Sequence, residues 1–591
     1  MGEAKRREHL AHQPHPVPAT HPSGVLPDAS SRAWLGVACL LLILGAIVYR
    51  NILRNPFLWD DPYLIVNNYF IKGFHFLPDL FTHHLYYSTG GVSNFYRPLQ
   101  SLVLMAEYAI WKTNPLGYHL TSIAFHVICA FLVFVMITVV FQRRGIAFLI
   151  SALFLIHPVM GAQVAYIAGR ADIQATALML LSLILVMLAS RTPQASWLRW
   201  RLMAASVSSY VLALLSKELA VIFPLFLMTV LAVTRIGSQR MTAPFWVALA
   251  IYGALRLSVL HFPSAAIVQA PPLWIRLLTS GEAFVRLIGL LMVPQQVLVE
   301  KHVPFAVSLF EPRTFLSVVA LAAVAAIGWW ARRRSRLVAF GLAWFFVSLL
   351  PSANLIPINA TMAIHWMFLP SIGLFLAVVG GAADWINSLR PSIQQVMRRL
   401  ALGLYALVLC GYGWVTMQQN AIWGDPERFF RLTIESAPEK SFRAHNELGS
   451  LYLDQGKLEA AVKEFQEAVR VNPSFDQAYD NLGTAYDHLE RFEEAIAAHQ
   501  QALSINPNNP KVYNNLGGAY LKSGRSEQAI EAFQKALSLN GSYAAALNNL
   551  GAAYYSVGRV EEARRCWQHV LALDPSATST RENLRLLNST H

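Results

Sequence analysis

The sequence predicts an all-α protein, in which a polytopic bundle of transmembrane helices is followed by an α-solenoid. Apolar residue types make up 55% of the 591 residues, charged types make up only 14%, and the mean hydropathy is +0.40. Soluble domains usually carry about 25% charged residues. The last quarter of the chain is polar instead, and it repeats a pattern every 34 residues. A single soluble enzyme and a disordered chain are both excluded.

The net charge of +13 comes from basic residues that stand in short clusters between apolar runs. Membrane topology explains such clusters, so we expect membrane lipid as a partner and no nucleic acid. The four cysteines show neither a pairing pattern nor a CxxC spacing. We therefore expect packing thiols and no metal site.

Residues 1–33 form a polar tail, and the apolar run that follows reads as an uncleaved signal-anchor that leaves the tail cytoplasmic. A span needs about 20 apolar residues. This rule gives eleven spans within a transmembrane domain of residues 34–420, at 34–49, 116–141, 146–164, 172–190, 200–216, 218–236, 243–262, 313–331, 337–355, 366–386 and 400–418.

Loop charges support the odd number of crossings, because every connection that this count places in the cytoplasm is basic, including Arg332–Arg336. The apolar stretch 276–293 carries Glu282 and Arg286 on one helix face. We therefore assign residues 263–312 to an outer or re-entrant segment. The C-terminal domain then lies outside the cytoplasm, in a bacterial periplasm or an endoplasmic reticulum lumen.

The 34-residue period matches the tetratricopeptide (TPR) repeat, a two-helix unit. Leu-Gly pairs, and a Tyr three residues after each Gly, recur at Gly449, Gly483, Gly517 and Gly551. We expect a linker at 421–441, four repeats at 442–577, and a capping helix with a short tail at 578–591.

Asparagines recur just before these glycines. Such a ladder resembles that of TPR superhelices that bind extended peptides, since an amide donates to and accepts from a peptide backbone at once. The alternative is that Asn is only a tolerated polar residue there. The peptide-binding candidates are Asn481, Asn514, Asn515, Asn548 and Asn549.

The first outer loop, residues 53–115, carries two adjacent carboxylates, Asp60 and Asp61. Acidic groups beside an apolar segment are costly to desolvate without partners. A solvated turn is the alternative, because Asp-Pro favours turns.

Further polar groups fall on the same side of the expected topology. A collection of polar groups at one face of a bundle suggests a site. The groups are Tyr96-Arg97-Pro98-Leu99, His157-Pro158, Gly169-Arg170-Ala171-Asp172, Lys217-Glu218, and His365 before Leu369-Pro370-Ser371-Ile372-Gly373.

Together with Trp59-Asp60-Asp61 and the TPRs, these motifs resemble the GT-C membrane glycosyltransferases of the TMTC type, protein O-mannosyltransferases, and their bacterial relatives. The resemblance covers about residues 34–577. It implies transfer of a mannose-like sugar from a polyprenyl-phosphate donor to Ser or Thr hydroxyls of acceptor proteins outside the cytoplasm. No other cofactor is evident.

The resemblance also implies residue roles. Asp60 would be the base that deprotonates the acceptor hydroxyl, and Asp61 would position it or share the role. The departing phosphate needs charge relief, which Arg and Lys supply. The donor-phosphate or substrate-binding candidates are Arg97, His157, Arg170, Asp172, Lys217, Glu218 and His365.

These residues also have structural alternatives. Arg97 could pair with a loop carboxylate, and Lys217 could pair with its neighbour Glu218.

Two positions depart from the family pattern. Ala162 stands where an acidic residue is usual, and Ile364-His365 stands where Glu-Arg is common. These changes imply either a different donor or a loss of catalysis, which leaves a non-catalytic, membrane-anchored TPR scaffold as the alternative. A transporter is a third and weaker hypothesis, because intramembrane charge is sparse.

Overall fold

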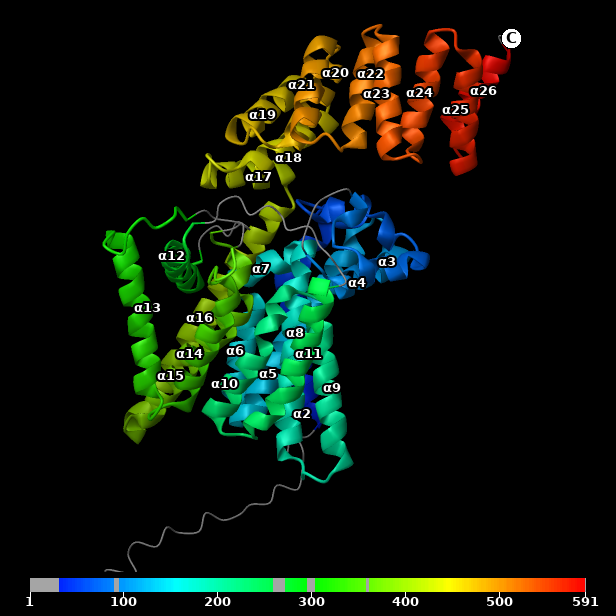
Figure 1. Ribbon diagram of the computed structural model, residues 1–591. Helices are drawn as coiled ribbons and strands as arrows, with labels where there is room; N and C mark the ends of the chain where they lie inside the picture. The colour runs from blue at the N-terminus through cyan, green and yellow to red at the C-terminus, as the bar shows by residue number, and fades with distance from the viewer. Residues whose placement is uncertain (1–30, 90–94, 259–270, 295–302, 358–360, 590–591) are drawn as a thin grey trace, which may run out of the picture.

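The computed structural model describes residues 31–89, 95–258, 271–294, 303–357 and 361–589. The polar tail expected at 1–33 lies almost entirely outside this range. Figure 1 shows two parts, a helical bundle and a stack of short helices at one end of it.

The bundle follows the apolar runs of the sequence, because a helix satisfies its own backbone hydrogen bonds where water is absent. Its helices are α2 (Ser31–Tyr49), α5 (Pro115–Phe141), α6 (Arg144–Ile156), α7 (Pro158–Ala165), α8 (Arg170–Arg191), α9 (Trp197–Leu214), α10 (Phe223–Thr234), α11 (Ala243–Ser258), α12 (Leu273–Met292), α13 (Pro312–Ala331), α14 (Arg336–Leu349), α15 (Phe368–Ser388) and α16 (Pro391–Trp423).

The count of eleven spans is not confirmed. Among the described residues, six helices are long and apolar enough to cross a membrane, or seven if the bent pair α6–α7 is one span. The other expected spans fall short for physical reasons. Helix α10 and helix α14 are short, α9 carries Arg199 and Arg201, and part of the run at 243–262 lies outside the described residues.

Burial separates a central layer of the bundle from a peripheral one. The apolar window of α8 is 72% buried inside the protein, whereas that of α16 is only 11% buried. The apolar surface of α16 therefore lies mostly on the outside of the bundle. Helices α14 and α15 cross closely at Gly341 and Gly373, where a Cβ atom on Gly341 would lie 2.4 Å from the Gly373 carbonyl oxygen.

Helices α6 and α7 form a pair that is bent by 56° at His157-Pro158. Proline lacks an N–H group and therefore fits the first turn of α7 rather than a continuous helix. His157 caps α7, with Nδ1 accepting a hydrogen bond from the Val159 N–H at 3.2 Å. The bend places the polar segment after α7 at the end of the bundle that carries the first outer loop.

The first outer loop folds into short helices, among them η2 (Pro62–Val66), α3 (Leu77–Thr82) and α4 (Pro98–Trp111). In Figure 1 this loop is blue and lies at the end of the bundle nearest the stack, beside the end of α16 that leads into the stack.

The stack consists of helix pairs with the expected 34-residue period. The segment expected as a linker contains a helix of its own, α17 (Pro426–Ser436). The paired helices are α18 (Phe442–Asp454) and α19 (Leu458–Val471), α20 (Asp476–His488) and α21 (Phe492–Ile505), α22 (Pro510–Lys522) and α23 (Ser526–Leu539), and α24 (Ala544–Ser556) and α25 (Val560–Leu573), followed by α26 (Thr578–Ser589).

Each repeat glycine lies against an aromatic ring of the second helix of its own repeat. A Cβ atom on Gly517 would lie 2.6 Å from the Phe533 ring. The glycine is therefore needed for the close approach of the two helices. The rings at this position are Phe465, His499, Phe533 and Trp567.

Candidate functional site

Asp60 and Asp61 have different surroundings although they are adjacent. Asp61 is 1% exposed, and its carboxylate accepts hydrogen bonds from the N–H groups of Ala168 at 2.9 Å and Leu58 at 3.4 Å. Asp60 is half-buried. Asp61 therefore ties the loop to the segment after α7, while Asp60 remains open to the surface.

Burial raises the pKa of Asp61 to about 7, although its backbone hydrogen bonds oppose the change, and the charge of Asp60 raises it further. A carboxyl group with this pKa carries a proton for part of the time at neutral pH. Because Asp61 is almost fully buried and bonded to backbone N–H groups, it suits a structural or positioning role rather than direct contact with a substrate.

Two tyrosines hold Asp60. The Tyr166 hydroxyl donates to Oδ2 of Asp60 at 2.5 Å, and Tyr86 also forms a side-chain hydrogen bond with Asp60. Burial, followed by the charge of Asp60, raises the pKa of both phenols, so they stay protonated donors. The Tyr166 ring stacks on Trp423 at the end of α16, with ring centroids 5.6 Å apart. The candidate base is therefore oriented by groups from three elements.

A cluster of paired charges lies near Tyr86, whose phenol is influenced by Arg97 as well as by Asp60. Arg97 donates to Glu218 Oε2 from Nη2 at 2.9 Å and from Nε at 3.1 Å. Lys217 donates to Asp172 Oδ2 at 2.6 Å. The sequence alternative that pairs Lys217 with its neighbour Glu218 is not what the structure has. Each cation instead pairs with a carboxylate distant in the sequence.

Arg170 is placed differently from the other two candidate cations. Its guanidinium is fully buried and donates to Glu107 from Nη1 at 2.7 Å and from Nη2 at 2.5 Å, and also to the Tyr118 carbonyl oxygen. This pair joins α4 to α8. Arg170 does not face the surface beside Asp60, and this geometry favours a structural role.

His157 also has its polar atoms engaged within the protein. Besides the cap of α7, its Nε2 is bonded to the Leu291 carbonyl oxygen in α12 at 2.9 Å. The ring therefore holds the bend against α12, and the geometry favours packing over donor binding.

The two departures from the family pattern meet in space. Gln163, the neighbour of Ala162, accepts a hydrogen bond from the His365 N–H at 3.2 Å when its amide is oriented to satisfy its surroundings. His365 is half-buried, and it lies close enough to Lys217, Asp172 and Arg97 for their charges to interact with its ring. Of the seven binding candidates, these three charged residues, Glu218 and His365 therefore share one region.

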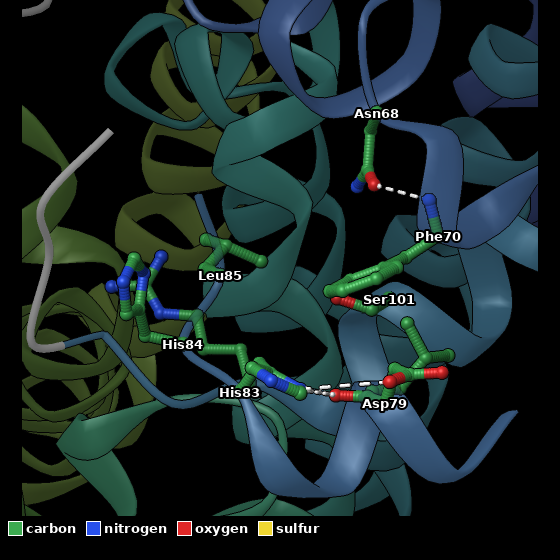
Figure 2. A pocket seen from close by; sticks show the side chains of 9 residues that line it. Asn68, Phe70, Asp79, His83, His84, Leu85 and Ser101 are labelled. Atoms are coloured by element: carbon green, nitrogen blue, oxygen red, sulfur yellow. Dashed lines mark hydrogen bonds and ion pairs between the residues drawn. The ribbon is translucent and has the colours of Figure 1, made fainter. Parts of the chain in front are cut away.

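A small pocket in the first outer loop opens next to Arg97 (Figure 2). Its volume is about 10 Å³, which suits a water molecule and not a sugar ring. Figure 2 shows His83 turned toward Asp79 and Asn68 bonded to the Phe70 N–H, so these polar groups serve the fold of the loop. Its lining residues are Asn68, Phe70, Asp79, Leu80, His83, His84, Leu85, Arg97 and Ser101.

The repeat asparagines form an inter-repeat ladder. Asn481 donates to Asn446 at 2.9 Å, and Asn549 donates to Asn514 at 3.0 Å. Asn515 donates to Asp480 at 2.9 Å in the same way. The ladder thus links neighbouring repeats, a role that the sequence alone did not indicate. Each amide keeps further donor and acceptor capacity.

The ladder meets the bundle at the first outer loop. The Gln477 amide in α20 donates to the Tyr63 hydroxyl at 2.6 Å, and Trp59 contacts Phe429 and Phe430 of α17, with ring centroids 6.0 and 6.2 Å away. Trp59, just before Asp60, therefore contacts the linker helix α17, and Tyr63, three residues after Asp60, contacts the second repeat.

Sequence reasoning missed the groups that orient Asp60 and dock the repeats, namely Tyr63, Tyr86, Tyr166 and Gln477. Nothing in a single sequence distinguishes these from ordinary polar side chains. Glu107 could have been found, because a carboxylate inside an apolar helix needs a buried partner.

Comparison with known proteins bears on this arrangement. The family model of the Cilia and flagella-associated protein 70 C-terminal domain matches residues 425–589. The chain is 24% identical to human Protein O-mannosyl-transferase TMTC1 over 500 residues, which cover 74% of this chain and 55% of that protein. It is 22% identical to human Protein O-mannosyl-transferase TMTC3 over 73% of this chain and 51% of that protein.

The resemblance to TMTC-type protein O-mannosyl-transferases is confirmed. A Drosophila melanogaster TMTC-type relative, Tmtc1, is 25% identical over 74% of this chain and 61% of its own length. The chain thus spans about half to three fifths of the length of these TMTC-type relatives.

Among solved structures, MamA is similar to 26% of this chain, with 25% identity, 89% of its own chain covered and a TM-score of 0.24. A thermophilic TPR protein of Thermus thermophilus is 22% identical over 32% of this chain and 95% of its own, with a TM-score of 0.25.

Proposed function

We propose that this chain is an integral-membrane glycosyltransferase. It moves a mannose-like sugar from a polyprenyl-phosphate donor to Ser or Thr hydroxyls of proteins outside the cytoplasm, and its repeats bind the acceptor. One observation carries the proposal, namely that Asp60 is oriented by Tyr166 at the end of the bundle that faces the repeats. The names of the TMTC-type relatives support the reaction class.

Asp60 would act as the general base. Tyr166 occupies Oδ2, and the other lone pairs of the carboxylate can accept the proton of an acceptor hydroxyl. The hydroxyl oxygen attacks the anomeric carbon as the bond to the donor phosphate breaks, and the phosphate leaves with the electron pair. Such general-base help is worth about 10²- to 10⁴-fold in rate.

Arg97 and Lys217 would stabilise the charge that develops on the departing phosphate. Both are held in place by carboxylates, at 12% and 15% side-chain exposure. A phosphate would therefore share these cations with Glu218 and Asp172 rather than meet them unpaired. His365 stands beside them, where its ring can contact the donor.

The proposed topology follows the charge of the loops. The N-terminus is cytoplasmic, and the repeats and the first outer loop occupy the periplasm or the endoplasmic reticulum lumen. Their position at one end of the bundle supports a shared compartment.

Replacement of Asp60 by Asn tests the proposal. Purified Asp60→Asn protein should transfer radiolabelled mannose from polyprenyl-phosphate mannose to an acceptor peptide at least about 100-fold more slowly than the parent chain. Asp79→Asn in the same loop is the matched control, because its carboxylate pairs with His83, 3.8 Å away. Parent-like transfer by Asp60→Asn would remove the proposed base.

A second function, a non-catalytic TPR scaffold, is favoured by the pairing of all three candidate cations with carboxylates. In a strain that lacks the gene, this alternative predicts rescue by a chain with Asn at both Asp60 and Asp61. Failure of that chain, together with rescue by the parent, would reject the scaffold.

A further inference from the structure

In the first repeat, the position that corresponds to the ladder asparagines is occupied by a different type of side chain. Asn481, Asn515 and Asn549 occupy equivalent positions in α20, α22 and α24, 34 residues apart. The equivalent residue of α18 is Glu447. Its neighbour Asn446 accepts from Asn481 at 2.9 Å and donates to Glu447 Oε1 at 3.3 Å. Glu447 is therefore the first rung of the ladder, and this rung carries a carboxylate.

The first rung and the candidate base lie close enough for their charges to interact. Burial raises the pKa of Glu447 to about 7, and the charge of Asp60 adds to the increase. Burial, followed by the negative charge of Glu447, raises the pKa of Tyr63 to about 12. The Tyr63 hydroxyl accepts a hydrogen bond from the Gln477 amide at 2.6 Å. Gln477 and Asn481 are one helical turn apart and share a face of α20. The face that carries the ladder therefore contacts the outer loop at Tyr63, three residues after Asp60.

Glu447 differs from the other carboxylates of the site in its partners. Asp172, Glu218 and Glu107 each have a cation within 3 Å. Within the part of the chain that the structure describes, Glu447 forms no ion pair. The positive charge of Arg443 has only a small effect on the pKa of Glu447. A cation that binds beside a half-buried carboxyl group of this kind favours its ionised form, so the group can hold a cation from outside the protein.

We propose that Glu447 is a specificity-determining residue that selects acceptor segments with a Lys or Arg beside the target Ser or Thr. The asparagine rungs bind the backbone of the same extended segment, so that the cation meets Glu447 while the hydroxyl meets Asp60. This inference rests on the proposed function and names the acceptor class for it.

Two synthetic peptides that differ at one position test the inference. Each carries a single Ser, flanked by Lys in one and by norleucine in the other, and each is assayed with the full-length protein and polyprenyl-phosphate mannose. The parent should favour the Lys peptide by about fivefold in kcat/KM, the ratio that corresponds to about 1 kcal/mol for an ion pair. The preference should lie in KM rather than in kcat.

The variant Glu447→Gln keeps the shape of the side chain and removes its charge, so the preference for the Lys peptide should fall to about one. Glu459→Gln, on the second helix of the same repeat with a side chain 73% exposed, is the control and should keep the preference. Equal use of the two peptides by the parent, or a preference that survives in Glu447→Gln, would overturn the inference.

Peptide binding separates this failure from failure of the proposed function. Fluorescence anisotropy with the same two peptides needs no sugar transfer. A parent that transfers to neither peptide would refute the proposed function. In that case the role of Glu447 stands if binding of the Lys peptide is tighter and loses this advantage in Glu447→Gln, and it falls if both peptides bind equally.

Discussion

Replacing Glu107 by Gln would remove the carboxylate that neutralises Arg170 while keeping nearly the same side-chain volume. The Arg170 guanidinium is fully buried, and both of its Nη atoms donate to Glu107, at 2.7 and 2.5 Å. Loss of one partner of such a pair costs about 3–5 kcal/mol, because the remaining charge stays buried without compensation. We expect Glu107→Gln to lower the melting temperature of the detergent-solubilised protein by several degrees, as followed by tryptophan fluorescence.

The double variant Glu107→Leu, Arg170→Met separates structure from catalysis. Replacement of both partners by apolar residues of similar size is often neutral or stabilising. The double variant should therefore melt within a few degrees of the parent. If Arg170 serves only the fold, sugar transfer returns with stability. If Arg170 contacts the donor phosphate, the protein folds but does not transfer.

An unchanged melting temperature in Glu107→Gln would refute this reasoning, because it would mean that water or another group compensates Arg170. The variant Glu435→Gln, at an exposed position of helix α17, is a control for the effect of losing one carboxylate at the protein surface.

Two further predictions concern Asp61 and the repeats. The folded pKa of Asp61, about 7, lies above its ordinary 3.8, so the stability it contributes when protonated is lost as the pH rises to about 7. Between about pH 5 and pH 8, the parent should therefore lose roughly 3 kcal/mol of unfolding free energy that Asp61→Asn does not lose. Melting curves of the two proteins that keep a constant separation at both pH values would contradict this prediction. Gly517→Ala should destabilise the repeats by about 1–3 kcal/mol because its Cβ meets an aromatic ring at 2.6 Å, whereas Gly518→Ala, with nothing within 4 Å, should stabilise them by up to about 1 kcal/mol. Circular dichroism melts of the full chain measure both, and equal effects would be inconsistent with the packing.

Local patterns in the sequence predicted the architecture well. The helices of the bundle coincide with apolar runs, and the helix pairs of the stack follow the 34-residue period, because both depend on side chains within one or two helical turns. The number of true spans was not predictable in this way. Helices α10 and α14 are shorter than the apolar runs that contain them, and a hydropathy pattern alone does not show where each helix ends.

The candidate site was predicted in its residues more than in its contacts. Asp60, Arg97 and Lys217 were singled out by motif, but a sequence does not specify which carboxylate each cation meets. Lys217 pairs with Asp172, 45 residues away, instead of with its neighbour. Only the three-dimensional arrangement of α8 and α9 decides that choice.

The repeats are joined to the outer loop through α17 and α20, near the first unit of the stack, while α24–α26 project away from the bundle in Figure 1. Such an attachment makes the stack extensible. Duplication of a 34-residue unit near the C-terminus would lengthen the stack without moving the side chains at the anchored end. The length of the stack and its attachment to the bundle can therefore evolve separately in this protein.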